Sequence, residues 1–422
     1  MKVKILEGNC IDALKSLPDE SVHTVITSPP YFGLRSYGTN PQVWGGQVLC
    51  KHVWEGKRTK RPNASGGQNS KKLKTKGTEN FQASVDYKDR AGYSDVCHCG
   101  AWRGELGMEP TPQLFVKNLV TIFKEVWRVL HKSGVLWLNI SDSYNGSGGA
   151  GGDYNGNGLK AGQAKYPGRK IPGLKSGDLC GVPWMLAMAL RDDGWYLRGS
   201  QIWCKGLSFC SSYSGSVMPE SVTSRPTRSH EYVFLLAKDP KYFYDNEAIR
   251  EPDCGGGGGR NIRSVWTIPL EQFPGPHFAV MPTALIVPCI KSGTSEKGVC
   301  SKCRAPYERI IEKISLGEKQ ETETPFEWDC ESWAHQGPKE MPEGMIEYKT
   351  IGWKQSCKCK GTSVVPATVL DPFGGAGTTA LVAHTLDRNS ISIELNPQYC
   401  DLQERRLRDA ADLFIDIDRE KI

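Results

Sequence analysis

The segment from Thr368 to Asn396 constrains the fold more than any other part of this 422-residue chain. It begins as an apolar strand, continues through a glycine-rich turn at residues 374–377 and a short helix, and ends in a second apolar strand, ISIELN. This order is typical of a parallel α/β sheet in which the glycine turn lets backbone approach a ligand closely. The segment therefore predicts a ligand site at the carboxyl end of a strand.

The rest of the chain repeats this alternation, which predicts a doubly wound α/β domain. No internal repeat is present. We expect strands at 3–6, 23–27, 134–140, 200–204, 230–238 and 242–245, and helices around 11–17 and at 114–130, 182–198, 277–290 and 397–410.

Two stretches interrupt the pattern and are interpreted as insertions. Residues 36–105 lose apolar periodicity and become rich in Gly, Lys, Ser and Asn, and residues 291–363 are charged and contain cysteines. The core is then made of residues 1–35, 106–290 and 364–422, with a flexible glycine-rich loop at 146–177.

Composition excludes several classes of protein. The N-terminus MKVKILEGN lacks the apolar centre of a signal peptide. No run approaches the roughly 18 apolar residues that a membrane span needs. We therefore expect a cytoplasmic protein, and we interpret its 15 cysteines as metal ligands or core residues rather than disulfides. The net charge of +6 is mild and would suit a polyanionic partner.

Two carboxylates limit the kind of ligand that the glycine turn could bind. Asp371 precedes the glycines and would place an anion where a dinucleotide has its pyrophosphate, which argues against an NAD-linked oxidoreductase and favours a ligand with a cationic amino group. Glu394 ends the next strand, where a carboxylate can bind both hydroxyls of a ribose.

A second motif, TSPPY, follows the strand at 23–27. Its two prolines remove two N–H donors and make a rigid loop whose carbonyl oxygens can accept hydrogen bonds. Ser28 adds a hydroxyl and Tyr31 adds an aromatic face. Acceptors for an amino group and a ring for stacking are what a flipped-out base requires.

Together, TSPPYFG at 27–33 and DPFGGAGTT at 371–379 closely resemble the amino-methyltransferases of DNA. In that family the first motif is the catalytic loop and the second binds S-adenosylmethionine. The catalytic loop precedes the glycine loop here, which resembles the permuted β class. The resemblance covers most of the chain except the insertions. It implies a Rossmann-like S-adenosylmethionine-dependent methyltransferase sheet of the seven-stranded type, with double-stranded DNA as substrate, in a bacterium or phage. It leaves open whether a restriction enzyme accompanies the protein.

The resemblance also implies roles for individual residues. The catalytic set is Ser28, Pro29, Pro30 and Tyr31. The cofactor set is Asn9, Cys10, Asp371, Phe373, Gly374, Gly375, Gly377, Thr378, Thr379, Glu394 and Asn396. Family members commonly have Asp where Asn9 stands. The segment HFAVMPTAL at 277–285 resembles one that lies near the methionine end of the cofactor.

The target base is interpreted as cytosine, methylated on its exocyclic N4 amine. Acceptors at Ser28 and the Pro29 carbonyl would bind the amine hydrogens and direct its lone pair toward the methyl donor, so that transfer is direct. Family members with Ser before Pro-Pro mostly act on cytosine N4, whereas Asp or Asn there mostly means adenine N6, which stays the alternative. A C5-cytosine enzyme would need a nucleophilic Cys after a proline, and Cys289 is instead expected in the core. A zinc-containing DNA-binding protein with an inactive core is the alternative of another class.

Two cysteine groups predict one or two structural zinc sites. In the second insertion the ligands are expected to be Cys300, Cys303, Cys357 and Cys359, as in a zinc ribbon. In the first insertion they are expected to be Cys50, His52, Cys97 and Cys99, with His98 as a neighbour only.

The two insertions are also expected to contact DNA, because the segment that usually reads the target sequence, roughly 246–262, is short here. The first insertion carries KRTKR at 57–61 and KKLKTK at 71–76. Lys57, Arg58, Lys60 and Arg61 are expected to contact phosphates, which position a duplex without reading it.

Overall fold

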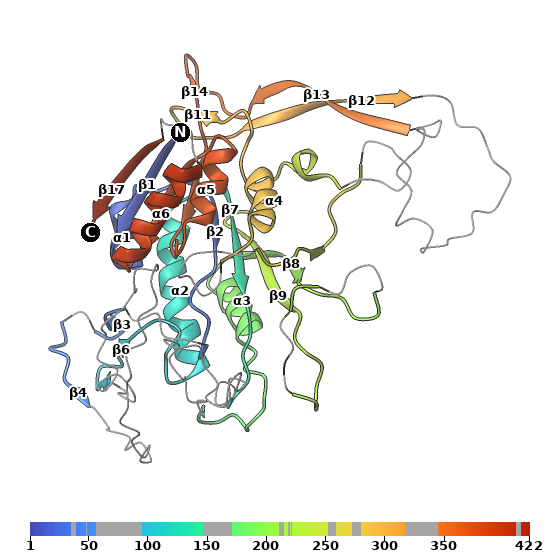
Figure 1. Ribbon diagram of the computed structural model, residues 1–422. Coiled ribbons are helices and arrows are strands. Elements are labelled where there is room, and N and C mark those ends of the chain that lie inside the picture. Colours follow the sequence, from blue (N-terminus) through green and yellow to red (C-terminus); the bar gives the residue numbers. More distant parts are fainter. Residues whose placement is uncertain are drawn as a thin grey trace, which may run out of the picture.

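A computed structural model describes residues 1–34, 39–47, 49–55, 95–146, 171–210, 215–217, 220, 222–251, 259–271, 280–316, 345–410 and 415–422. Nine of the described strands form one sheet, in the order β10-β8-β9-β7-β2-β15-β16-β1-β17 (Figure 1). Their bounds are β1 Lys2–Glu7, β2 Val22–Thr27, β7 Leu130–Ile140, β8 Tyr196–Cys204, β9 His230–Ala237, β10 Val265–Thr267, β15 Thr368–Asp371, β16 Asn389–Glu394 and β17 Asp416–Lys421.

Strand direction is parallel throughout this sheet except at β9, which runs antiparallel to both β7 and β8. The seven strands from β8 to β1 make the sheet that the sequence predicts. Two further strands, β10 and β17, extend the two edges of this sheet. β17 was missed because Ile417 is its only apolar residue. Ile415 and Ile417 pack against the core beside Cys400 and Leu407 of α6 (Pro397–Ala410).

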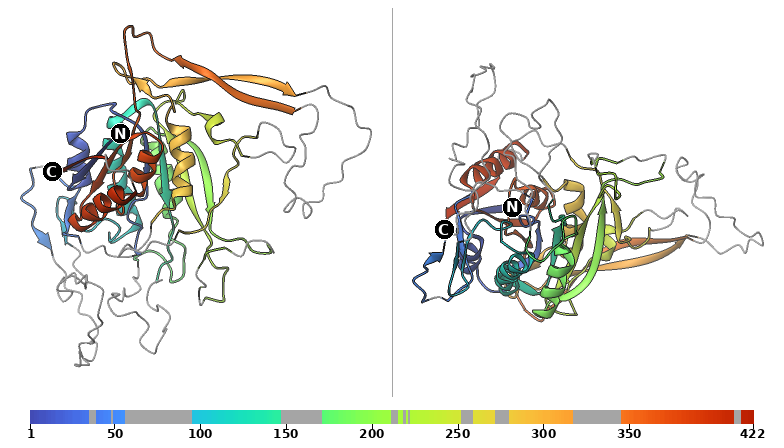
Figure 2. Two further views of the ribbon diagram at one scale, coloured as in Figure 1. Left: turned by 45° about the horizontal axis from the view of Figure 1, so that its top comes forward. Right: turned by 90° about the horizontal axis from the view of Figure 1, so that it is seen from below.

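Helices cover both faces of the sheet, which confirms the doubly wound α/β class (Figure 2). Successive residues of a strand point to opposite faces, so Leu136 of β7 packs with one helical layer and Trp137 with the other. One layer holds α1 Cys10–Ser16, α2 Pro112–Val129 and α3 Val182–Asp192, and the other holds α4 Thr283–Gly293, α5 Thr378–Thr385 and α6. Among the described helices, none combines the length and the apolar character that crossing a membrane would need.

Three expected elements differ from the structure. The expected helix at 182–198 ends at Asp192, and residues 196–198 belong to β8 instead. Residues 242–245 form no strand. Instead, the Asp245 carboxylate accepts a hydrogen bond from the backbone of Ala248 and so caps a 3-10 helix, η1 (Asn246–Ile249). Residues 277–279 of the expected helix at 277–290 lie outside the described residues. Among residues 280–290 the helix begins at Thr283, after Pro282 in an extended conformation at φ −66° and ψ 146°.

The first insertion contributes a small antiparallel sheet in the order β3-β6-β5-β4. Trp44 and Trp102, on two of its strands, are buried in the main core together with Phe32 and Phe115. This insertion is therefore fused to the core rather than attached by a tether. Its strands are β3 Gln42–Trp44, β4 Trp54–Glu55, β5 Asp95–Cys97 and β6 Trp102–Gly104.

The second insertion contributes a long antiparallel ribbon that projects from the domain (Figures 1 and 2). The ribbon pairs β12 (Tyr307–Leu316) with β13 (Met345–Gln355), and a smaller pair joins β11 (Val299–Cys300) to β14 (Val364–Val365). Its base lies at the amino ends of the parallel strands: the ring Nε2 of His23, at the start of β2, lies 3.1 Å from the carbonyl oxygen of Arg304.

A buried ion pair fixes this ribbon to the core. The Arg309 guanidinium donates to both carboxylate oxygens of Asp245, at 2.9–3.1 Å, and the Asp245 side chain is only 3% exposed. Arg309 also donates to Glu296, whose side chain is 60% exposed. Two acidic partners of such different burial allow a matched comparison.

We expect Arg309→Leu to lower the free energy of unfolding by about 3 kcal/mol, since it leaves the buried Asp245 carboxylate without its cation. Glu296→Gln removes only an exposed charge and should cost about 0.5 kcal/mol or less. Urea unfolding of both variants measures the difference. Equal losses would show that the ribbon does not depend on the buried pair.

Candidate active site

One cavity of about 580 Å³ lies at the carboxyl ends of the central parallel strands. Its walls include the residues that follow β2, β15 and β16, together with the first residues after β1. β2 and β15 are paired in parallel, so the TSPPY loop and the glycine loop leave the sheet side by side. The structure thus brings together two motifs that lie more than 340 residues apart.

Glycine is required in the loop after β15 for steric reasons. A Cβ on Gly374 would lie 1.9 Å from the Ser392 hydroxyl oxygen and 2.9 Å from Nε2 of Gln403, so a larger residue would require both side chains to shift. Gly375 and Gly377 have positive φ values of 50° and 75°, a backbone region that other residues avoid. Gly377 then begins α5 as its N-cap. The loop can therefore pass close to a ligand in the cavity.

One buried carboxylate and one half-buried carboxylate face this cavity. Asp371 is 3% exposed and accepts hydrogen bonds from the Thr27 hydroxyl at 2.6 Å and the Thr379 hydroxyl at 2.8 Å. Glu394 accepts from the backbone N–H groups of Gly375 and Asn396. Burial raises the pKa of Asp371 to about 6 and that of Glu394 to about 7. A cationic ligand would stabilise the ionised form of these carboxylates, and its hydroxyl groups could donate hydrogen bonds to them. The two acceptors therefore fit the predicted cofactor.

The remaining cofactor candidates divide into those that line the cavity and those that support it. Asn9 lines it and also caps α1 through its side chain, which accepts from the backbone of Ile11. Cys10, Phe373, Thr378 and Thr379 line it as well. Gly377 and Asn396 do not line it; Asn396 supports Glu394 through its backbone. Burial raises the pKa of the Cys10 thiol to about 12, so this thiol is neutral near pH 7.

The catalytic candidates line the same cavity. Ser28, Pro29, Pro30 and Tyr31 all contribute to its wall. The Tyr31 ring is partly buried against the core, and its hydroxyl lies 3.0 Å from the Ser28 hydroxyl. Tyr31 thus offers a fixed hydroxyl as well as the aromatic face for which the sequence singled it out.

Several polar residues of this wall were missed by sequence reasoning, among them Asn139, Lys205 and Glu231, which contact one another. Glu231 accepts from the Tyr31 hydroxyl at 2.6 Å and is paired with Lys205. A usable signal existed, because each residue lies at an end of an apolar segment that was expected to form a strand. Polar residues at strand ends gather at one edge of a sheet.

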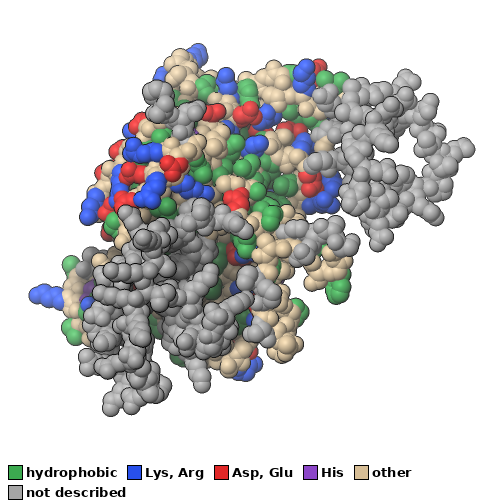
Figure 3. Space-filling view, viewed as in Figure 1, with side chains coloured by type: hydrophobic (Ala, Val, Ile, Leu, Met, Phe, Trp, Pro, Cys, Tyr) green, Lys and Arg blue, Asp and Glu red, His purple; other side chains and the backbone are tan. Residues whose placement is uncertain are grey.

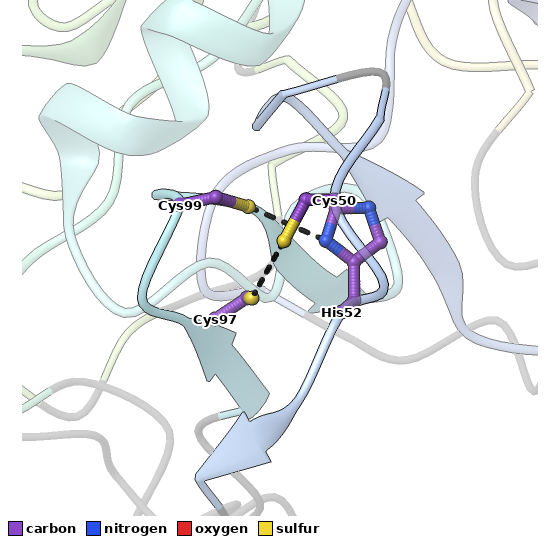
Figure 4. Close-up of side chains that lie close together, drawn as sticks. All are labelled: Cys50, His52, Cys97 and Cys99. Atoms are coloured by element: carbon purple, nitrogen blue, oxygen red, sulfur yellow. Dashed lines mark hydrogen bonds between the residues drawn. The ribbon is translucent and has the colours of Figure 1, made fainter.

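The cysteine group of the first insertion comes together as the sequence predicts (Figure 4). The Cys50 and Cys97 sulfurs are 3.7 Å apart, and the Cys99 sulfur is 3.3 Å from Nδ1 of His52. All four ligand atoms lie within 4.8 Å of one another. Hydrogen bonds from the backbone, first from Gln47, lower the pKa of Cys99 to about 6. The set fits a tetrahedral metal ion.

Cys300, Cys303, Cys357 and Cys359 form a second group of the same compactness. A backbone hydrogen bond from Cys303 is the main cause that lowers the pKa of Cys300 to about 6. The two groups differ in their relation to the cavity. Gln42 and Trp44 of the first insertion line the cavity, whereas none of the described residues of the second insertion does.

Some candidates lie elsewhere. Lys57, Arg58, Lys60, Arg61 and the second basic stretch fall outside the described residues. On the described part of the face shown in Figure 3, basic and acidic side chains are interspersed around α6. Cys289 is 1% exposed within α4 and does not line the cavity, and burial raises its pKa. It is a core residue, as expected.

The chain matches one protein family and is similar to several known proteins. The family model described as DNA methylase matches residues 22–301 and 306–405. Type II methyltransferase M.Cfr9I of Citrobacter freundii is 31% identical over 96% of this chain and 87% of its own length. Type II methyltransferase M.XycI of Xanthomonas campestris pv. cyanopsidis is 32% identical over the same shares. Type II methyltransferase M.SmaI of Serratia marcescens is 30% identical over 96% of this chain and 90% of its own length. The chain therefore belongs to the DNA methylase family, the amino-methyltransferases that its two loop motifs predicted.

Proposed function

We propose that the protein transfers the methyl group of S-adenosylmethionine to the N4 amine of a flipped-out cytosine in double-stranded DNA. The observation that carries this proposal is the single cavity shared by the TSPPY loop and the glycine loop. Its volume of about 580 Å³ is in the range of ligand pockets. Ser28 favours cytosine over adenine, because Ser before Pro-Pro is mostly found in enzymes that act on cytosine.

Different residues of the cavity would bind the cofactor and the target base. Asp371 and Glu394 would hold the cationic and the hydroxyl-bearing parts of the cofactor. The cofactor supplies an electrophilic methyl group on a sulfonium. Ser28 and the Pro29 carbonyl would accept hydrogen bonds from the amine of the base, which localises its lone pair. Lys57, Arg58, Lys60 and Arg61 remain our candidates for phosphate contacts.

The direct test is product analysis. Duplex DNA is incubated with the protein and cofactor carrying an isotope-labelled methyl group, then digested to nucleosides and examined by mass spectrometry. We expect labelled N4-methylcytosine. Labelled N6-methyladenine would keep the enzyme class and overturn the base, whereas no label in either nucleoside would overturn the methyltransferase itself.

We also propose that the protein accompanies a restriction enzyme and protects DNA from it, because the relatives are named Type II methyltransferases. Once sequencing of the treated DNA has located the methylated position, methylated DNA should resist the nuclease that cuts the same site. Cleavage at an unchanged rate would contradict the role.

The two raised pKa values predict that cofactor affinity depends on pH. Asp371 must be ionised to bind a cation, and Glu394 must be ionised to accept hydrogen bonds from two hydroxyl groups, so affinity should rise as pH increases through the range of about 6 to 7. At pH 6 one proton must leave Glu394, which weakens binding about tenfold relative to pH 8. Calorimetric titration across this range measures the effect.

Glu394→Gln is the matched control for that titration. It keeps the shape of the side chain and removes the group that titrates. Its affinity should be lower at pH 8, and its dependence on pH should be smaller than that of the wild type. If the variant keeps the full dependence, Glu394 is not the titrating group.

We further propose that both cysteine groups bind structural zinc, about two ions per chain. Thiolates and one imidazole leave no open coordination position for catalysis. A small insertion with few apolar residues needs such a cross-link to hold its fold.

Substitution of one group at a time separates their roles. Cys97→Ser with Cys99→Ser, and Cys303→Ser with Cys359→Ser, should each remove about one zinc ion by metal analysis. We expect only the first pair to weaken cofactor binding, because Gln42 and Trp44 of that insertion line the cavity. Equal effects of both pairs on cofactor affinity would contradict this assignment.

A further inference from the structure

A buried carboxylate lies in the cavity wall beside the catalytic loop. Glu231, at the start of β9, is 8% exposed. One of its oxygens is paired with the ammonium of Lys205, which follows the end of β8. The other oxygen accepts from the Tyr31 hydroxyl at 2.6 Å and from the Asn139 amide at 3.1 Å. A carboxylate at this depth is tolerated only because each oxygen has a partner.

These contacts determine the atom to which each hydroxyl group donates its hydrogen bond. An ionised carboxylate can only accept, so the Tyr31 hydroxyl donates its proton to Glu231. Asn139 offers Tyr31 a second acceptor at 2.9 Å, but the shorter bond to a charged oxygen is the stronger one. The Tyr31 oxygen then accepts from the Ser28 hydroxyl at 3.0 Å. The result is a directed chain from Ser28 through Tyr31 to Glu231.

The direction of this chain determines what Ser28 can do. Its proton points toward Tyr31, and among the described residues none donates a hydrogen bond to its oxygen. The lone pairs of that oxygen are therefore available to a donor in the cavity. A serine hydroxyl can either donate or accept, and an amine that must be activated needs it to accept.

We propose that Glu231, held by Lys205, is the positioning residue that sets Ser28 as an acceptor and receives the proton released by the target amine. The proposal rests on the function proposed above. As the nitrogen–methyl bond forms, the sulfur–methyl bond breaks and its electron pair stays on sulfur. The amine proton passes to the Ser28 oxygen, the Ser28 proton to Tyr31, and the Tyr31 proton to the Glu231 carboxylate. Glu231 ends neutral and returns its proton to solvent after the product leaves, so charge is balanced throughout.

Two substitutions interrupt this chain without changing the shape of the wall. Tyr31→Phe keeps the ring and removes only the hydroxyl, and Glu231→Gln replaces the charged acceptor. We expect each to lower the single-turnover rate constant of methyl transfer about 100-fold, as for the loss of proton-transfer catalysis. The affinities for S-adenosylmethionine and duplex DNA should change by less than about twofold, since neither substitution removes a group that binds them.

Because the two groups act in series, the double variant should be no slower than the slower single variant. The control is Tyr232→Phe, which removes a hydroxyl from the neighbouring position of β9 outside this chain and should leave the rate constant unchanged. If Tyr31→Phe fails to fold, Glu231→Gln alone still decides.

The relay would be overturned if the single-turnover rate constants of both variants lay within about threefold of the wild-type value. Reduced cofactor or DNA affinity at an unchanged rate constant would also overturn it, because that result would mean a merely structural role. A wild-type protein that transfers no methyl group to DNA would instead contradict the proposed function, so the two failures can be told apart.

Discussion

The hydrogen bond between the Thr27 hydroxyl and the Asp371 carboxylate joins the two halves on which the site depends. Thr27 ends β2 and Asp371 ends β15, and both side chains are buried. The next residue after Thr27 opens the TSPPY loop, and the residues after Asp371 form the glycine loop. Parallel pairing of these strands brings the loops to one edge, and this bond fixes the distance between their first residues. The cavity cannot form without that register.

The two insertions depend on the core in opposite ways. The first is fused to the cavity wall: Gln42 accepts a hydrogen bond from the Asn9 amide at 3.0 Å, and Trp44 is buried in the core. A few residues farther on, a Cβ on Gly46 would lie 2.9 Å from the Cys99 sulfur. The cysteine–histidine group of the first insertion and the cavity are thus connected through one short strand. The second insertion is fixed at the opposite ends of the strands by Arg309 and Asp245, and none of its described residues lines the cavity.

The predictable part of the molecule is the part whose residues act locally. The glycine loop, the TSPPY loop and both cysteine groups are each set by residues close in sequence or by an obligatory ligand chemistry. The expected strand at 242–245 was wrong because contacts of Asp245 determine the structure there. Asp245 accepts a hydrogen bond from Arg309 and caps η1. Glu231 was missed because its role depends on Lys205 and Tyr31, which reach it only through the folded sheet. Its place at the end of an expected strand indicates the edge of the sheet, but no local pattern could have shown which residues it pairs with.

The antiparallel strand β9 explains why this site can hold a carboxylate opposite the cofactor loops. Parallel strands present their carboxyl ends at the active edge, so their side chains there come from the residues just after each strand. β9 runs the other way, and it therefore enters the sheet at that edge with Glu231 near its first residue. Its neighbours β7 and β8 end there and supply Asn139 and Lys205. One reversed strand thus places an acid between an amide and an ammonium, facing the hydroxyl of Tyr31, and a wholly parallel sheet would offer no strand start at this position.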